Sequence, residues 1–450
     1  MEFILVIISV FSVLFCIKSR LYHKSILTVF CMLWTLVFVL YSLRLFDLYD
    51  CKDRTFLMYI IGFSSFFFGY ILIRPTKIKD VNQINDRRKV ISKLRNTVIV
   101  VLSIVSIVVL ARKTMLAIPL WMAGGAGEVK RSIIMDDALN VGGIQEIIYT
   151  FIARPMQIIM VIYAVIVILA NLKQKYIVWL AALLTMAGYI CSGSKSAVTE
   201  IATMVFTYVF LFTKMSFKHF YLKYKTLSIA IILVIGFVGF MLSLKEEGLG
   251  LELYTYLCGC MPCSDEALTK IYDDNSFWGL ASFNGILRAV NLIPHYLGIG
   301  PDFKVVLDLV WTEMMNFEDT TFIADNIKYN AFVSMFIYFY ADGGYWGVFV
   351  ISFVFGLSCS YIQKNAFKRP SIYSYSIVLY FVVMITLSIV RFQFFYAPYA
   401  MAFIYIFILF PRTPIKNLSY SFSKSNNPRR LQHSLEKTKI PIDVLSSSSC

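Results

Sequence analysis

Long runs of apolar residues, separated by short basic segments, constrain the fold of this chain more than any other feature. A helix needs about 20 mostly apolar residues to cross about 30 Å of hydrocarbon. Eleven stretches approach that length, near residues 3–17, 25–43, 56–73, 97–111, 156–170, 176–191, 197–212, 227–244, 345–362, 373–390 and 395–410. The sequence therefore predicts an all-α, polytopic integral membrane protein with about eleven transmembrane helices.

The composition excludes the main soluble classes. Of 450 residues, 58% are hydrophobic and only 15% are charged, whereas soluble domains carry about 25% charged residues. A water-soluble enzyme, a disulfide-rich secreted domain and a disordered regulator are all excluded. The first apolar stretch has no basic n-region and no small-residue cleavage site before Lys18, so we expect a membrane span there rather than a signal peptide.

The basic residues predict the orientation. Of the 42 Lys and Arg residues, 27 lie in alternate loops and in the tail, namely 18–24, 74–96, 171–175, 213–226, 363–372 and 411–450. Because loops rich in Lys and Arg stay cytoplasmic, we expect the N-terminus outside and the C-terminus inside. The net charge of +15 then reflects topology, and nucleic acid is not an expected partner because no basic stripe interleaves with aromatic residues.

The predicted spans divide the chain into four parts. We expect about eight membrane helices in 1–244, a large external loop in 245–331, about three membrane helices in 332–410 and a disordered cytoplasmic tail in 411–450 that touches anionic lipid. A smaller external loop is expected over about 112–155.

The stretch 332–362 is too long for one span, because its 31 residues would form about 46 Å of helix. The residues Asp342-Gly343-Gly344 interrupt it. We expect an interfacial or re-entrant helix over 332–341, a break at 342–344 and a span from 345.

The 245–331 loop has a composition suited to carbohydrate. It holds 13 acids, 5 bases and 12 aromatic residues, among them Tyr256 and Trp278. Aromatic rings stack on sugar faces and carboxylates accept from sugar hydroxyls, although an interfacial belt of Tyr and Trp would look similar. For Cys258, Cys260 and Cys263 in the same loop, the sequence leaves open no special role, a disulfide or a metal site, and for a zinc site too few ligands are near.

The turn Ser192-Gly193-Ser194-Lys195-Ser196 opens the span that begins near 197. Exposed N–H groups, the positive helix end, the hydroxyls of Ser194 and Ser196 and the Lys195 ammonium form a candidate phosphate site. The same residues would also suit an ordinary hairpin turn with a snorkelling lysine. Glu200 lies one turn further into this helix. An ionisable residue inside a span is a candidate functional residue, while pairing with Lys195 or packing against a neighbouring helix is the alternative.

Three arginines on the external side are further candidate anion ligands. They are Arg154, Arg288 and Arg391, each beside apolar residues. Arginine binds phosphate groups bidentately, while interfacial anchoring is the alternative. Among the 13 loop carboxylates, Asp265, Glu266, Glu318 and Asp319 are candidate bases, because glycosyl transfer requires a group that removes a proton from a hydroxyl. The sequence does not choose among these carboxylates, and the alternative is that most of them are simply solvated.

Four stretches, taken in order, resemble the bacterial oligosaccharide repeat-unit polymerases, the O-antigen polymerase family. The stretches are Cys191–Ala197, Tyr254–Asp265, Phe277–Gly285, and Asn330–Phe332 followed by Tyr340–Gly347. Two positions depart from the family pattern. Lys195 stands where an arginine is usual, and Gly343 stands where a phenylalanine is usual in Asp-Phe-Gly.

The resemblance implies a glycosyltransferase of the bacterial cytoplasmic membrane. Such enzymes transfer a growing glycan from a polyprenyl-diphosphate carrier onto a new lipid-linked repeat unit at the outer membrane face, producing O-antigen or capsule. Arg154, Lys195, Arg288, Asp265 and Asp342 would then be catalytic, and Ser194, Ser196, Arg391, Tyr256, Trp278 and Asn330 would bind substrate. No cofactor or metal is expected, and a chain-length regulator and a flippase of the same pathway are implied partners.

Three other functions remain in competition. A lipid-linked glycan transporter or flippase would place ionisable groups near mid-span, and the predicted span interiors hold almost none. An O-antigen ligase would share the lipid-diphosphate donor. A structural membrane scaffold would not explain the external carboxylates and cations.

Overall fold

The structure is a computed structural model. It describes residues 1–19, 22–73, 93–135, 143–169, 172, 174–192, 196–212, 249–271, 276–298, 303–317, 321–325, 327–329 and 333–412. Several sequence predictions lie outside the described residues: Ser194, Lys195, Glu318, Asp319, Asn330, the span 227–244 and positions 413–450 of the tail.

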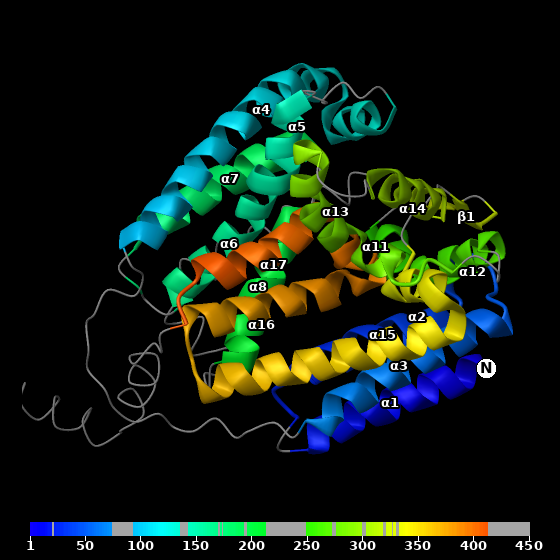
Figure 1. The fold of residues 1–450 in the computed structure, drawn as a ribbon. Coiled ribbons are helices and arrows are strands. Elements are labelled where there is room, and N and C mark those ends of the chain that lie inside the picture. The colour runs from blue at the N-terminus through cyan, green and yellow to red at the C-terminus, as the bar shows by residue number, and fades with distance from the viewer. Residues whose placement is uncertain are drawn as a thin grey trace, which may run out of the picture.

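Apolar helices build most of the described chain (Figure 1). The bundle contains α1 (Glu2–Lys18), α2 (Ile26–Ser42), α3 (Asp53–Leu72), α4 (Lys93–Met135), α6 (Arg154–Leu169), α7 (Tyr176–Ser192), α8 (Ser196–Phe212), α15 (Met335–Lys368), α16 (Ile372–Thr386) and α17 (Ala397–Leu409). Within the described part, five segments are long and apolar enough to cross a membrane: Asp53–Leu72, Leu94–Ala123, Gly143–Ile168, Met335–Lys368 and Ile372–Ile389. The helical membrane-protein prediction is confirmed at this level.

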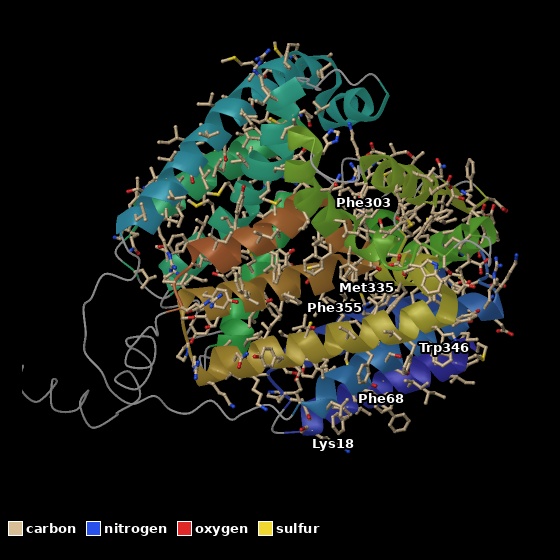
Figure 2. All side chains as sticks on the ribbon, in the orientation of Figure 1. Lys18, Phe68, Phe303, Met335, Trp346 and Phe355 are labelled. Carbon is tan, nitrogen blue, oxygen red and sulfur yellow. The ribbon has the colours of Figure 1, made fainter. Side chains whose placement is uncertain are left out.

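The helices pack in three layers. In Figure 1, α1, α2, α3 and α15 form one side, α6, α8, α16 and α17 the middle, and α4 and α7 the other side. Met335 and Phe355 are buried between helices, whereas Phe68 and Trp346 are exposed on the bundle surface (Figure 2). Exposed apolar side chains on long apolar helices are what a lipid-facing surface requires.

Glycines bring α3 and α15 into backbone contact. A Cβ on Gly69 would lie 2.2 Å from the carbonyl oxygen of Phe353, and a Cβ on Gly356 would lie 2.2 Å from that of Phe66. Small residues at such crossings permit close helix packing within a membrane.

The expected break in the last third of the chain is confirmed. Helix α15 contains non-helical backbone at Gly343 and Gly344, where Gly344 has a φ of +58°. A residue with a Cβ is disfavoured at that φ, so glycine permits the break. The eight residues before Gly343 thus form a short buried segment, and the rest of α15 continues as a long helix.

The described part of 112–155, where we expected a smaller external loop, is helical. Helix α4 continues to Met135, and α5 (Gly143–Ile148), a five-residue π-helical turn labelled η2 (Tyr149–Ala153) and α6 follow as one helical segment. The 43 residues of α4 extend about 64 Å at 1.5 Å per residue, so α4 is about twice as long as the hydrocarbon core is thick.

The described residues of 245–331, the predicted external loop, are mostly in regular secondary structure. They form α11 (Leu249–Cys258), α12 (Cys260–Lys270), α13 (Leu280–Leu297), α14 (Lys304–Phe317) and an antiparallel hairpin of β1 (Thr321–Ala324) and β2 (Ile327–Tyr329). This small hairpin departs from a purely helical fold. The Tyr254 hydroxyl donates to the carbonyl oxygen of Leu40 at 3.1 Å, which attaches α11 to the end of α2.

The three clustered cysteines lie where α11 meets α12. Cys258, Cys260 and Cys263 are not joined in disulfides, and each is at most 1% exposed. No group of three potential metal ligands forms among the described residues. The thiols therefore act as small packing residues in this structure.

Candidate functional site

Helices α6, α8 and α17 begin at the same end of the bundle, around Arg154, and we call this end the site end. Pro155 has no N–H, so the carbonyl oxygen of Phe151, four residues earlier, lacks its α-helical donor. The Tyr405 hydroxyl on α17 donates to that oxygen at 2.8 Å. The backbone widens into the π-helical turn here, and the Arg154 N–H donates to Tyr149 O. Such turns are frequent at functional sites.

As a whole residue, Arg154 is half-buried. Its Nη1 donates to Gln157 Oε1 at 2.5 Å. Gln157 itself is packed against Gly188 of α7, where a Cβ would lie 2.3 Å from its amide nitrogen. In the described part of the chain, no carboxylate lies within 4.0 Å of this guanidinium. Among the described residues, the charge of Arg154 therefore has no direct counter-ion.

Glu200 supplies a negative charge near Arg154 without contacting it. Its side chain is 6% exposed and accepts a hydrogen bond from the Tyr399 hydroxyl at 2.8 Å. The charges of Glu200 and Arg154 interact electrostatically. Sequence reasoning noted Glu200 but missed Tyr399 and Gln157, which no motif marks.

The candidate phosphate-binding turn lies directly before α8, the helix that carries Glu200. Helix α7 ends at Ser192 and α8 begins at Ser196, so the positive N-terminal end of α8 lies four residues before Glu200. Ser194 and Lys195 lie outside the described residues, and of Ser196 only the backbone is described.

A second basic group near the cluster is neutralised. Lys113 on α4 forms a 2.7 Å ion pair with Glu146 on α5, and its ammonium lies 3.8 Å from the Tyr149 ring centroid. Lys113 is buried, and burial of a charge requires such pairing. This pair attaches α4 to the segment that positions Arg154.

Arg288 on α13 is also neutralised by direct contact. Its Nη2 lies 2.6 Å from Asp308 Oδ1 on α14 and donates to the carbonyl oxygen of Leu307 at 3.1 Å. Its Nε donates to Asn284 Oδ1 at 2.7 Å. These bonds fix the guanidinium plane and join α13 to α14.

Arg391 and Arg288 both contact an aromatic cluster formed by Trp311, Phe395 and Tyr396. Arg391 Nη1 donates to the Tyr396 hydroxyl. The Trp311 ring packs against Tyr396 at 5.1 Å, stacks on Phe395 at 4.8 Å and lies 5.2 Å from the Arg288 guanidinium. The structure thus brings Arg288 and Arg391 to one Trp–Tyr pair.

Asp342 holds the start of α13. Its Oδ1 accepts from the N–H groups of Gly279 and Ala281 at 2.9 Å, and its Oδ2 accepts from that of Ser282 at 2.8 Å. A carboxylate is favoured at a helix N-terminus by these free donors and by the helix dipole. Three donors already occupy the two oxygens, which gives Asp342 the geometry of a helix cap.

Asp265 performs a similar task for α3. Its Oδ1 accepts from the Lys52 N–H at 2.9 Å and from the Thr55 hydroxyl. These donors lie at the first turn of α3, so the contact attaches α12 to the start of a membrane helix. Asp265 and Asp342 are therefore placed apart from the Arg154 cluster, each at its own helix end.

The two aromatic candidates are both on the surface. Tyr256 is 47% exposed and Trp278 is 88% exposed. Trp278 has a φ of +52°, which is unusual for a bulky residue. Its N–H donates to the carbonyl oxygen of Asp342 at 3.0 Å, so the same cap residue holds this conformation.

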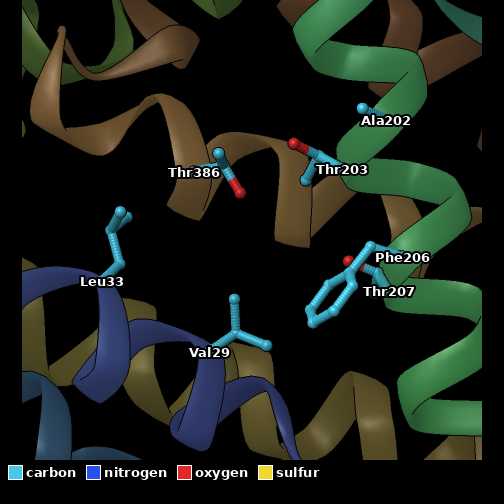
Figure 3. Close-up of a pocket in the computed structure, with 7 residues that line it drawn as sticks. All are labelled: Val29, Leu33, Ala202, Thr203, Phe206, Thr207 and Thr386. Carbon is cyan, nitrogen blue, oxygen red and sulfur yellow. The ribbon is translucent and has the colours of Figure 1, made fainter. Parts of the chain in front are cut away.

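An apolar groove of about 320 Å³ lies between α2, α8 and α16. Figure 3 shows Val29 and Leu33 of α2 facing Thr203 and Phe206 of α8, with Thr386 of α16 completing the wall. None of the lining residues carries a charge. Of the two regions on α8, the start of the helix near Arg154 is therefore the one suited to an anion.

Comparisons with known proteins identify no relative of this chain. No protein-family model matches it, and no curated protein or solved structure is significantly similar to it. The functional argument consequently rests on the site and on the sequence resemblance.

Proposed function

We propose that the protein is a membrane glycosyltransferase that polymerises polyprenyl-diphosphate-linked oligosaccharide repeat units into a surface polysaccharide. The reaction would take place at the outer face of the bacterial cytoplasmic membrane. The observation that carries this proposal is Arg154, a guanidinium held at the site end with no carboxylate within 4.0 Å among the described residues. A diphosphate is the kind of ligand that such a donor group binds.

The chemistry requires little else from the protein. An acceptor sugar hydroxyl attacks the anomeric carbon of the donor glycan, and the bond from that carbon to the diphosphate oxygen breaks. The lipid diphosphate leaves with the electron pair, and the hydroxyl proton passes to a base. Arg154, Lys195 and the N-terminal end of α8 would stabilise the charge that develops on the leaving group.

The roles of the other candidates follow from their contacts. We assign Asp342 and Asp265 to positioning, because both cap helices, and Arg288 and Arg391 to shaping the region between α13, α14 and α17. Tyr256 and Trp278 remain candidates for stacking on glycan, since both are exposed. No cofactor is needed, because a diphosphate is already an activated leaving group.

One observation favours a second candidate, a lipid-linked glycan transporter. Glu200 is a buried carboxylate inside an apolar bundle and is hydrogen-bonded to Tyr399. Ionisable groups in such positions are common in coupled transporters. Glu200 lies within two turns of the start of α8 rather than at mid-helix, which agrees better with a site at the membrane surface.

Deleting the gene distinguishes these functions. Surface glycan from the deletion strain is separated by gel electrophoresis beside that from the parent strain. A polymerase deletion leaves single repeat units attached to their acceptor and no ladder of longer chains. A deletion strain with no repeat unit on its surface would indicate the transporter instead, and an unchanged ladder would exclude both.

A further inference from the structure

A cavity of about 140 Å³ lies between α13, α14 and the helical segment that leads into Arg154. Its polar wall contains Arg288, Asn291, His295, Lys304 and Asp308, and Phe151 contributes to its apolar wall. None of these residues except Arg288 was a candidate from the sequence. Pockets for drug-sized ligands measure about 300–1,000 Å³, so this cavity suits one small ring rather than an oligosaccharide.

The walls of the cavity combine donors, acceptors and apolar surface. Arg288 and Lys304 donate, the Asp308 carboxylate accepts, and the Asn291 amide does both. A sugar ring has hydroxyl groups that donate and accept around its edge and C–H groups on its faces. The bonds from Arg288 to Asn284 and Asp308, at 2.7 Å and 2.6 Å, fix the polar wall before any ligand binds. Such preorganisation favours binding.

Charge separates this cavity from the anion site at Arg154. The wall also holds the Lys304 ammonium. The Arg288 charge, however, is matched by Asp308 at 2.6 Å, and the Asp308 carboxylate would repel a phosphate placed beside it. Arg154 has no such neighbour within 4.0 Å in the described chain. The phosphate and the sugar are therefore best accommodated at different ends of this region.

The cavity and the Arg154 anion site are adjacent along one helical segment. Phe151 lines the cavity, and Arg154 follows three residues later, a rise of about 4.5 Å along a helix. In a glycosyl diphosphate the sugar and the phosphate are joined directly. We infer that this cavity is the subsite for the single sugar residue attached to the lipid diphosphate. The inference rests on the proposed function and adds to it the position of that sugar.

Binding measurements on the purified full-length protein test the inference. The two probes are farnesyl diphosphate and farnesyl-diphosphate-linked monosaccharides, measured in detergent by isothermal titration calorimetry. The variants are Asn291→Leu and Asp308→Asn in the cavity wall and Arg154→Ala at the anion site. Arg369→Ala, exposed at the far end of α15, is the matched control, and thermal unfolding of each variant verifies that it is folded.

We expect each cavity variant to weaken binding of the glycosylated probe at least tenfold and that of farnesyl diphosphate less than twofold. Arg154→Ala should weaken binding of both probes. Equal weakening of both probes by the cavity variants, or no weakening, would overturn the sugar subsite. Arg154→Ala could leave the affinity for both probes unchanged while the cavity variants still weaken binding of the glycosylated probe. In that case the proposed diphosphate site would be wrong and the sugar subsite would stand.

Discussion

The hydroxyl of Tyr399 on α17 donates to Glu200 Oε1 on α8 across 2.8 Å, which holds the carboxylate near Arg154 without a direct ion pair. In this position Glu200 offsets part of the Arg154 charge. An arriving diphosphate must compete with that carboxylate for the guanidinium.

Replacing Glu200 by glutamine should therefore tighten binding of farnesyl diphosphate. We expect a gain of about threefold to tenfold, equivalent to ~0.7–1.4 kcal/mol, measured by calorimetry on the purified protein. Tyr399→Phe, which removes the hydrogen bond and keeps the carboxylate, is the control and should change affinity less. Weaker binding by Glu200→Gln in a folded protein would show that the carboxylate contributes to binding instead.

Two substitutions of Lys195 test the candidate phosphate-binding turn. Lys195→Ala should abolish polymer in a complemented deletion strain while the amount of membrane protein stays constant, because one cation is lost. Lys195→Arg should retain polymer, since it preserves the charge and restores the residue usual in the resembled family. The gel pattern of surface glycan is the measurement, and a full ladder in Lys195→Ala would remove this residue from the site.

Asp342 should matter for stability more than for chemistry. Asp342→Ala removes the acceptor of three backbone N–H groups at the start of α13. Loss of a helix cap costs about 0.5–2 kcal/mol, so the thermal unfolding midpoint should fall. A variant with unchanged unfolding and no activity would make Asp342 a catalytic residue after all.

The thiol of Cys258 should resist alkylation in the folded protein. Burial raises the pKa of Cys258 to about 12, so at pH 8 about one thiol in ten thousand is the reactive thiolate. Ionisation increases as the pH rises, and labelling by a maleimide should accelerate with pH or on unfolding. Mass spectrometry of the labelled peptide measures this, and rapid labelling at pH 8 or a disulfide at Cys258 would contradict the structure.

Much of the membrane bundle could be predicted because apolar runs are a direct requirement of the bilayer. The break at Gly343 and Gly344 was predictable for a similar reason, since two glycines interrupt a run too long for one span. The helices α11 to α14 were not, because they contain no long apolar run and their packing depends on contacts such as Tyr254 with Leu40.

The site could be predicted only in part. Arg154 and Glu200 stand out in the sequence because a charge beside apolar residues is conspicuous. The pairing of Glu200 with Tyr399 spans 199 positions, and no local pattern encodes it. The capping contacts of Asp265 and Asp342 could not be predicted, because the backbone groups that they bind lie 213 and 63 positions away in the sequence.

The most direct test of the account concerns the Arg154 charge. The deletion strain is complemented with wild-type protein, Arg154→Ala, Arg154→Lys and the control Arg369→Ala, and surface glycan is compared at equal amounts of membrane protein. The account predicts full-length ladders for wild type and Arg369→Ala, single repeat units for Arg154→Ala and shortened ladders for Arg154→Lys, which keeps the charge but loses bidentate binding. A full-length ladder from Arg154→Ala would contradict it.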